Sequence, residues 1–84
     1  MDQEAHKRYK DRENSGRSVR LQDLIERLYE HDELAAEGIE KQFEIAHEET
    51  AWDDAPGAEA RYEGKLQDLI DVAETILGAY EFVA

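Results

Sequence analysis

Cysteine is absent from the 84-residue chain, and proline and tryptophan each occur once. Without cysteine the fold has neither disulfides nor thiolate metal sites, so side-chain packing has to stabilise it. No hydrophobic run approaches the length of a membrane span, and the N-terminal segment lacks the apolar stretch of a secretory signal. We therefore expect one small cytoplasmic domain that does not bind membranes.

Signatures of catalysis are missing as well. The sequence has no glycine-rich phosphate loop, and no setting of histidine and carboxylate surrounds its serines and threonines, which are Ser15, Ser18, Thr50 and Thr75. Glu44 and His47 have the E-x-x-H spacing of di-iron carboxylate bundles, but such a site needs a second pair and the sequence holds only one. These gaps predict a protein that is not an enzyme and binds no metal or cofactor.

Positive charge is scarce, and most of it lies near the N-terminus. The chain has 22 acidic and 10 basic residues, which gives a net charge of −12. Six of the bases but only four of the acids fall within residues 1–20, so this stretch carries +2 and residues 21–84 carry −14. So acidic a body should repel nucleic acid and anionic lipid and attract basic protein surfaces.

The polarity of the chain divides it into two parts. Residues 1–17 are polar and end in Asn14-Ser15-Gly16, a cluster that favours a turn. We expect a flexible basic arm here, because so polar a stretch cannot offset its ordering entropy by burial. A short helix over residues 3–12 is the alternative. Residues 18–84 are expected to form an acidic helical domain.

Residues 18–48 have the periodicity of an amphipathic helix, with Ser18 as a suitable N-cap. Asp32 lies near the apolar seam, so a break into two helices near His31 and Asp32 is the alternative to one helix of about 45 Å. The acidic residues keep their spacing across this point, which favours one helix. The apolar positions are Leu21, Leu24, Ile25, Leu28, Ala35, Ile39, Phe43 and Ala46.

Residues 50–57 contain Pro56 and predict a reversal of the chain, with Trp52 covering the open end of the core. A second helix is expected over about residues 58–82. Its apolar residues alternate by four and three, as in a coiled-coil seam, and predict an oligomer interface made by Tyr62, Leu66, Leu69, Ala73, Ile76, Tyr80 and Val83. The predicted fold is all-α, an antiparallel hairpin of two long helices that pairs with a second copy into a four-helix-bundle-like assembly.

A short internal similarity links the two predicted helices. Residues 20–26 (RLQDLIE) match residues 65–71 (KLQDLID) in identity or charge at every position. The similarity fades on both sides, so chance, a shared packing motif and duplication of a helical unit are all open. A genuine repeat predicts equivalent roles in two antiparallel helices.

Eight carboxylates recur at steps of three or four within residues 23–48. On a continuous helix they form one line, which we call the acidic stripe: Asp23, Glu26, Glu30, Glu33, Glu37, Glu40, Glu44 and Glu48. Like-charge neighbours at about 0.2–0.5 kcal/mol each bring the repulsion to about 1.4–3.5 kcal/mol at low salt. A cost of this size indicates that the stripe either binds something positive or works where salt screens it.

Three interpretations of the acidic stripe are open: an ordinary solvated face, adaptation to high salt, and mimicry of a nucleic-acid backbone. We predict a non-catalytic inhibitor that mimics nucleic acid and blocks a basic groove of a nucleic-acid-binding protein. Small acidic helical proteins of phages and mobile elements act in this way against host defences, which is an analogy by class, since no family motif occurs. The alternative is a structural or assembly module that acts through its apolar seam and C-terminus.

Overall fold

The computed structural model describes residues 15–51 and 56–81, and these residues form three α-helices and no strand. Helix α2 spans Gly16–His31, α3 spans Glu33–Ala51 and α4 spans Ala58–Glu81. The all-α prediction is therefore confirmed for this part of the chain. The predictions made for residues 1–14, for Trp52 and for Val83 lie outside the described residues.

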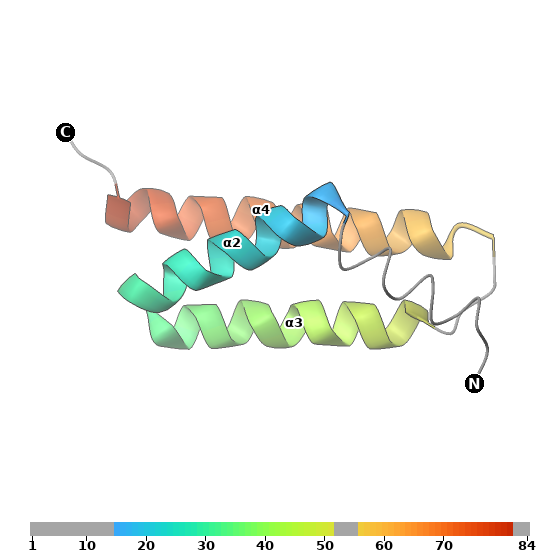
Figure 1. The fold of residues 1–84 in the computed structure, drawn as a ribbon, viewed down its shortest axis with the longest axis horizontal. Helices are drawn as coiled ribbons and strands as arrows, with labels where there is room; N and C mark the ends of the chain where they lie inside the picture. Colours follow the sequence, from blue (N-terminus) through green and yellow to red (C-terminus); the bar gives the residue numbers. More distant parts are fainter. Residues whose placement is uncertain (1–14, 52–55, 82–84) are drawn as a thin grey trace.

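The three helices form a bundle in which each helix packs against the other two. Figure 1 shows α2 and α4 running in the same direction and α3 returning in the opposite one. The stretch expected to form one helix over residues 18–48 thus contributes two helices, α2 and α3. The expectation of a hairpin of two long helices is wrong, and the alternative of a break is confirmed.

The break falls on Asp32. Its backbone leaves the helical region (φ −150°, ψ 90°), while its N–H still donates to the carbonyl oxygen of Leu28 at 2.7 Å. Its side chain accepts a hydrogen bond from the backbone N–H of Ala35 at 3.1 Å. Asp32 therefore ends α2 and caps the N-terminus of α3, a position that aspartate favours. In a continuous helix the same carboxylate would lie near the apolar seam, where a charge is costly.

Helix α2 begins at Gly16 because Ser15, and not Ser18, is its N-cap. The Ser15 Oγ accepts a hydrogen bond from the Ser18 backbone N–H at 3.2 Å. Ser18 lies inside the first turn, where it is buried and accepts a hydrogen bond from the Gln22 side chain at 3.1 Å. Arg17, which the sequence assigned to the basic arm, accordingly belongs to α2.

The turn before α4 ends in Pro56 and Gly57. Gly57 has a φ of 88°, a left-handed conformation that glycine adopts without steric cost. Its carbonyl oxygen accepts the backbone N–H of Arg61 at 2.9 Å, which closes the first turn of α4. Pro56 precedes the helix, where its missing N–H leaves no gap in the helical hydrogen bonds.

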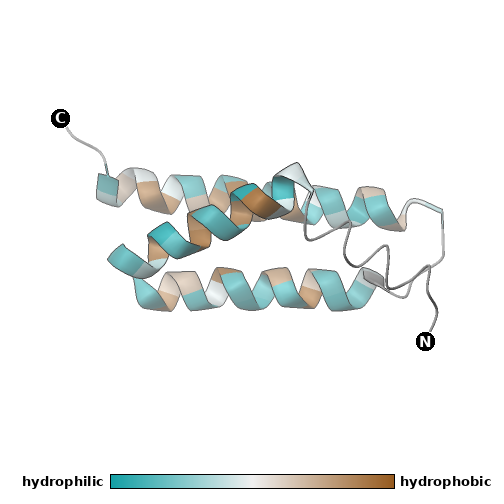
Figure 2. Cartoon of the chain, viewed as in Figure 1, coloured by the Kyte–Doolittle hydropathy of each residue, from teal (hydrophilic) through white to brown (hydrophobic). Residues whose placement is uncertain are grey.

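Apolar side chains from all three helices meet in one core. Figure 2 shows hydrophobic positions recurring at intervals along each helix between hydrophilic ones. The buried cluster consists of Leu21, Leu24, Ile25 and Leu28 from α2, Ala36 and Ile39 from α3, and Tyr62, Leu66, Ile70, Ala73 and Leu77 from α4. Each helix thus supplies one apolar side. In α3 the buried alanine is Ala36, whereas the predicted Ala35 is only half-buried.

The two similar segments, residues 20–26 and 65–71, lie on α2 and α4. Leu21 and Ile25 are buried in one segment, and Leu66 and Ile70 are buried at the matching positions of the other. The shared sequence therefore serves a shared packing role. The two helices run in the same direction, so the expectation that they are antiparallel is wrong.

The hinge at Asp32 is fastened to the C-terminal end of α4 by contacts that we call the hinge latch. The Tyr80 hydroxyl donates to Oδ2 of Asp32 at 2.9 Å, and the Tyr80 ring stacks on His31 with centroids 5.6 Å apart. Glu81 accepts a hydrogen bond from Arg27 and lies 3.3 Å from Nε2 of His31. The hinge latch holds the hinge against the C-terminal end of α4. The bonds of Asp32 with Leu28 and Ala35 do not do this, because they lie within α2 and α3.

Replacing Asp32 with Ala should lower the free energy of unfolding by about 0.5–2 kcal/mol, because the N-cap bond to Ala35 is lost. Asp32→Asn should cost less, since its side-chain oxygen can still accept that bond. Urea unfolding followed by circular dichroism measures both variants. Equal stability of Asp32→Ala and the wild type would show that the cap does not hold the hinge.

The hinge latch also predicts a loss of stability in acid. The Ala35 N–H and then the Tyr80 hydroxyl hold the pKa of Asp32 below its usual value, and the Arg27 guanidinium lowers the pKa of Glu81. A carboxyl group with a depressed folded-state pKa stabilises the fold at neutral pH, and this contribution disappears as the pH falls through that pKa.

The Asp32→Asn, Glu81→Gln double variant should therefore melt at a lower temperature than the wild type at neutral pH. The difference should narrow as the pH falls through the lowered pKa values of the two carboxyl groups, because protonation removes the same charges in the wild type. Comparing the two proteins at each pH cancels the general relief of repulsion among the other acids. A difference in melting temperature that stays constant between neutral and acidic pH would show that the charges of Asp32 and Glu81 are not its cause.

Candidate functional site

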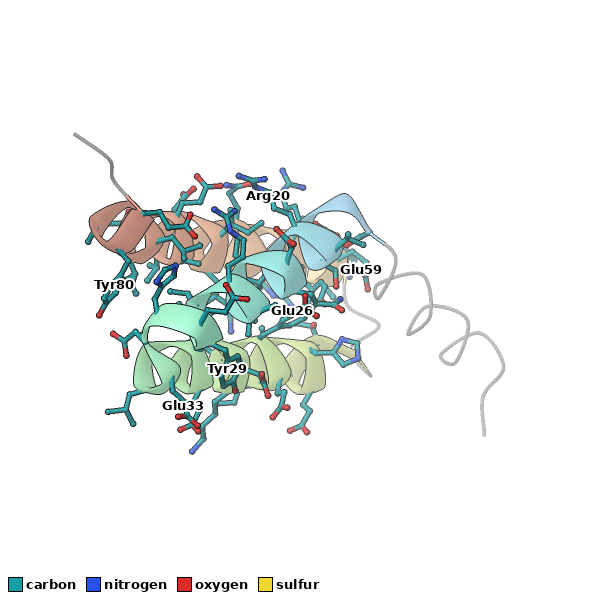
Figure 3. All side chains as sticks on the ribbon, turned by 60° about the vertical axis from the view of Figure 1, so that its left-hand side comes forward. Arg20, Glu26, Tyr29, Glu33, Glu59 and Tyr80 are labelled. Atoms are coloured by element: carbon teal, nitrogen blue, oxygen red, sulfur yellow. The ribbon has the colours of Figure 1, made fainter. Side chains whose placement is uncertain are left out.

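The arginines of α2 pair with acids of α4. The pairs are Arg17 with Glu63 at 3.3 Å, Arg20 with Glu74 at 2.6 Å, and Arg27 with Glu81. Figure 3 shows Arg20 on the side of α2 that faces α4. The side chains remain partly exposed, so each pair contributes little stability. Their main effect is to neutralise one side of the bundle.

The break at Asp32 divides the acidic stripe between two helices. Asp23, Glu26 and Glu30 lie on α2, and Glu33, Glu37, Glu40, Glu44 and Glu48 lie on α3. Glu40 is half-buried and the other seven are exposed. Ion pairs found within residues 15–51 and 56–81 involve Glu49, Glu63, Glu74 and Glu81, and none of them includes a stripe acid.

A groove of about 660 Å³ runs between α2 and α3. Three stripe acids line it: Glu26 from one helix, and Glu40 and Glu44 from the other. The buried or half-buried part of its lining mixes apolar and polar side chains and consists of Ser18, Ile25, Glu40, Phe43, His47 and Tyr62. The groove therefore combines an acidic rim with a floor that can hold the aliphatic or aromatic part of a bound side chain.

Tyr29 connects the two sides of the groove. Its hydroxyl donates to Oε2 of Glu40 at 3.1 Å, and Figure 3 shows its side chain lying over α3. Partial burial, followed by the carboxylates of Glu40, Glu37 and Glu33, raises the pKa of Tyr29. These carboxylates of α3 thus lie close to the edge of α2. We call Glu26, Glu33, Glu37, Glu40 and Glu44 the acidic face.

Sequence reasoning found the acids of this face but missed Tyr29 and the groove. Tyr29 follows the apolar position Leu28 and falls outside the helical period, so its spacing gave no reason to select it. Glu40 comes eleven residues later and reaches Tyr29 only because the chain reverses at Asp32. Asp23, Glu30 and Glu48 are exposed, but they do not line the groove.

The residues predicted as an oligomer interface are mostly used within the chain. Tyr62, Leu66 and Ala73 are buried in the core, and Leu69 and Ile76 pack against it while partly buried. Tyr80 is 49% exposed and takes part in the hinge latch. The predicted interface residues of α4 thus pack largely against α2 and α3 of the same chain. Pairing with a second copy stays a prediction.

The geometry of the described residues bears on metal binding and on membrane spanning. Glu44 is exposed, whereas His47 is buried with its ring 5.7 Å from that of Tyr62, so the E-x-x-H pair does not converge on one point. Within the two described ranges, no group of three or more acidic or histidine side chains is placed to hold a metal ion. None of the described helices combines the length and apolar character needed to cross a bilayer.

The acidic face and its groove are therefore the most distinctive feature of the described surface. Comparison of the chain with known protein families, with curated proteins and with solved structures found no match. The distribution of charge and the groove are the features of the described residues that bear on function.

Proposed function

We propose that the chain is a non-catalytic acidic binding protein that mimics nucleic acid and blocks a basic groove of a nucleic-acid-binding protein. The observation that carries the proposal is the separation of charge in the bundle. Three arginines of α2 pair with acids of α4, and the acidic face lies on the other flank of α2. Residues 33–51 contain one lysine and no arginine beside their six glutamates.

The arrangement of the acids resembles a nucleic-acid backbone in two respects. Along α3, a glutamate every three or four residues places charges about 5 Å apart on the axis, against about 3.4 Å for the phosphates of one DNA strand. The acids of α2 add a second row, and packed helices have axes about 8–10 Å apart. That separation lies between the widths of the minor and major grooves, about 6 and 12 Å.

Binding to a basic groove would also remove a cost that the free protein carries. Neighbouring stripe acids repel one another within each helix, and lysines or arginines of a partner would lie between them. The attraction is long-ranged and would speed encounter at low salt. Direct binding of nucleic acid is disfavoured by the same charge. The proposed partner is therefore a protein that itself binds nucleic acid.

The acidic face can be tested by replacing Glu37 and Glu44 with Gln. Binding to the partner should weaken by about tenfold or more at low salt, because two charges at the centre of the face are lost. The dependence of affinity on salt should become shallower. Titration against a panel of nucleases and repressors at two salt concentrations measures both effects, and nucleic acid should compete with the wild-type protein.

Asp68→Asn combined with Asp71→Asn provides a matched control, since both residues are exposed on α4 and the change in net charge is the same. This variant should bind like the wild type. An equal loss in both variants would show that net charge alone determines binding. The Gln variant should be as stable as the wild type or slightly more so. Loss of helicity in dilute buffer would favour adaptation to high salt instead.

An assembly module is the second candidate function, favoured by apolar side chains left on the surface. Leu34 is 81% exposed, and Val72 is 49% exposed. Sedimentation at about 50 µM should then show a dimer, whose population depends on concentration. Leu69→Glu should dissociate it and destabilise the fold, because Leu69 also packs against the core. A monomer at this concentration would contradict the assembly prediction.

A further inference from the structure

The three sides of the bundle differ in their side chains. The side between α2 and α3 holds the groove and three acids of the acidic face. The side between α2 and α4 holds the ion pairs of the three arginines. Between α3 and α4, Ile45, Ala46 and Leu69 belong to the lining of a smaller pocket. Apolar side chains of both helices remain accessible on this third side.

Helix α3 contributes a side that holds none of its stripe acids. Leu34 and Ile45 are eleven residues apart, which is about three helical turns, so they lie on the same side of the helix. Leu34 is exposed and Ile45 is half-buried. Gly38 and Gln42 lie between them on that side and carry no charge. The glutamates of the acidic face lie on the side of α3 towards α2.

Helix α4 contributes apolar residues at steps of three and four, which place them on one side. Val72 and Tyr80 are about half exposed, and Leu69 and Ile76 pack against the core while partly buried. We call the residues of both helices the apolar face: Leu34, Ile45, Leu69, Val72, Ile76 and Tyr80.

Two contacts fix how α3 and α4 lie beside each other. Tyr80 donates to Asp32 at 2.9 Å at one end, and Lys65 pairs with Glu49 at 2.6 Å at the other. Figure 1 shows the two helices running in opposite directions. All residues of the apolar face fall between these two contacts or at them. The apolar residues of the two helices therefore lie side by side.

Charge selects this side for contact between copies of the chain. With a net charge of −12, two copies that met through their acidic faces would place glutamate against glutamate. The charged residues at the end of the apolar face are Lys65, Glu49 and Asp68, one base and two acids. Repulsion is thus small here, and the base of one copy can meet an acid of another.

The size of the apolar face is sufficient for a dimer of moderate affinity. It extends for about 22 Å along two helices, each about 10–12 Å across with its side chains, which gives about 500 Å² per copy. Two copies then bury about 1,000 Å², the lower limit of a specific interface.

We propose that the chain forms a two-fold symmetric dimer through the apolar face. A two-fold axis parallel to the helices places α3 of one copy against α4 of the other. The four helices then alternate in direction, as in an antiparallel four-helix bundle. Lys65 of each copy lies at the level of Glu49 of the other copy, so opposite charges meet across the interface.

The acidic face of each copy stays accessible in this dimer, because it lies on the side between α2 and α3. The next step rests on the proposed function. Two acidic faces related by a two-fold axis suit a partner that is itself two-fold symmetric, as proteins that bind palindromic DNA are. Once one groove of such a partner is bound, the second contact becomes intramolecular, which raises the overall affinity.

Val72 and Val19 provide a matched pair of substitutions, because both are exposed valines within helices. Val72→Gln removes part of the apolar face, whereas Val19→Gln changes α2 only. Val72→Gln should raise the dissociation constant of the dimer at least about tenfold, since the change occurs twice in each dimer. Val19→Gln should leave the constant unchanged. Sedimentation equilibrium over a range of concentrations measures both.

Leu34→Gln provides a second test, because Leu34 is largely exposed and its replacement leaves the core intact. It should weaken the dimer about as much as Val72→Gln, and circular dichroism should show wild-type helicity in both variants. A wild type that stays monomeric at about 50 µM would overturn the proposal. So would a dimer that neither variant weakens, or one that Val19→Gln weakens equally.

Dilution of the wild-type protein locates the interface independently. Amide NMR signals of residues 34–45 and 69–80 should shift between dilute and concentrated samples. Signals of Asp23 and Glu26, which are exposed on α2, should stay in place. Shifts confined to α2 would place the interface on another side of the bundle and overturn the proposal.

Partner binding separates the dimer from the proposed function. For a two-fold symmetric partner, Val72→Gln should lower the affinity about 100-fold or more where the variant is monomeric. Glu37→Gln with Glu44→Gln should also weaken binding but leave the dimer intact. A dimer that binds no such partner would refute the nucleic-acid mimicry alone. Partner binding by a wild type that stays monomeric would refute the dimer alone.

Discussion

The two caps made by Asp32 set the direction of the other elements. Its N–H ends α2 on Leu28 and its carboxylate begins α3 on Ala35, so the chain reverses at a single residue. Aspartate suits this position because its side chain replaces a helical hydrogen bond at the start of α3. The bundle of three helices follows from this reversal, since α2 then packs against both of the other helices.

The reversal also determines where charge accumulates. On one long helix the eight acids would form a single line, whereas the hinge places them on two adjacent helices with Tyr29 reaching Glu40 between them. The arginines of α2 occupy the opposite flank and pair with α4. Among the described residues, the ion pairs of the arginines thus lie between α2 and α4, and none of the ion pairs includes an acid of the acidic face. The helices can tolerate the remaining repulsion because packing, rather than surface charge, supplies most of their stability.

Hydrophobic packing within the chain uses most of the apolar residues that form the coiled-coil pattern of α4. Residues alternating by four and three require a neighbouring apolar surface, but the pattern does not say which chain provides it. Here α2 and α3 together cover Tyr62, Leu66 and Ala73. A single helix of residues 18–48 would have offered only one covering surface. The break provides two covering surfaces, one on α2 and one on α3, and a core then becomes possible within one small chain.

The sequence by itself determined that residues 18–48 and 58–81 are helical and which side of each is apolar, because helical periodicity is a local property. It also determined the eight acids and marked Asp32 as the place for a break. Tertiary structure alone decided that the break occurs, because its energy depends on the packing of α2 against α3 and α4. The groove and the contact of Tyr29 with Glu40 arise from residues far apart along the chain, which no local pattern brings together.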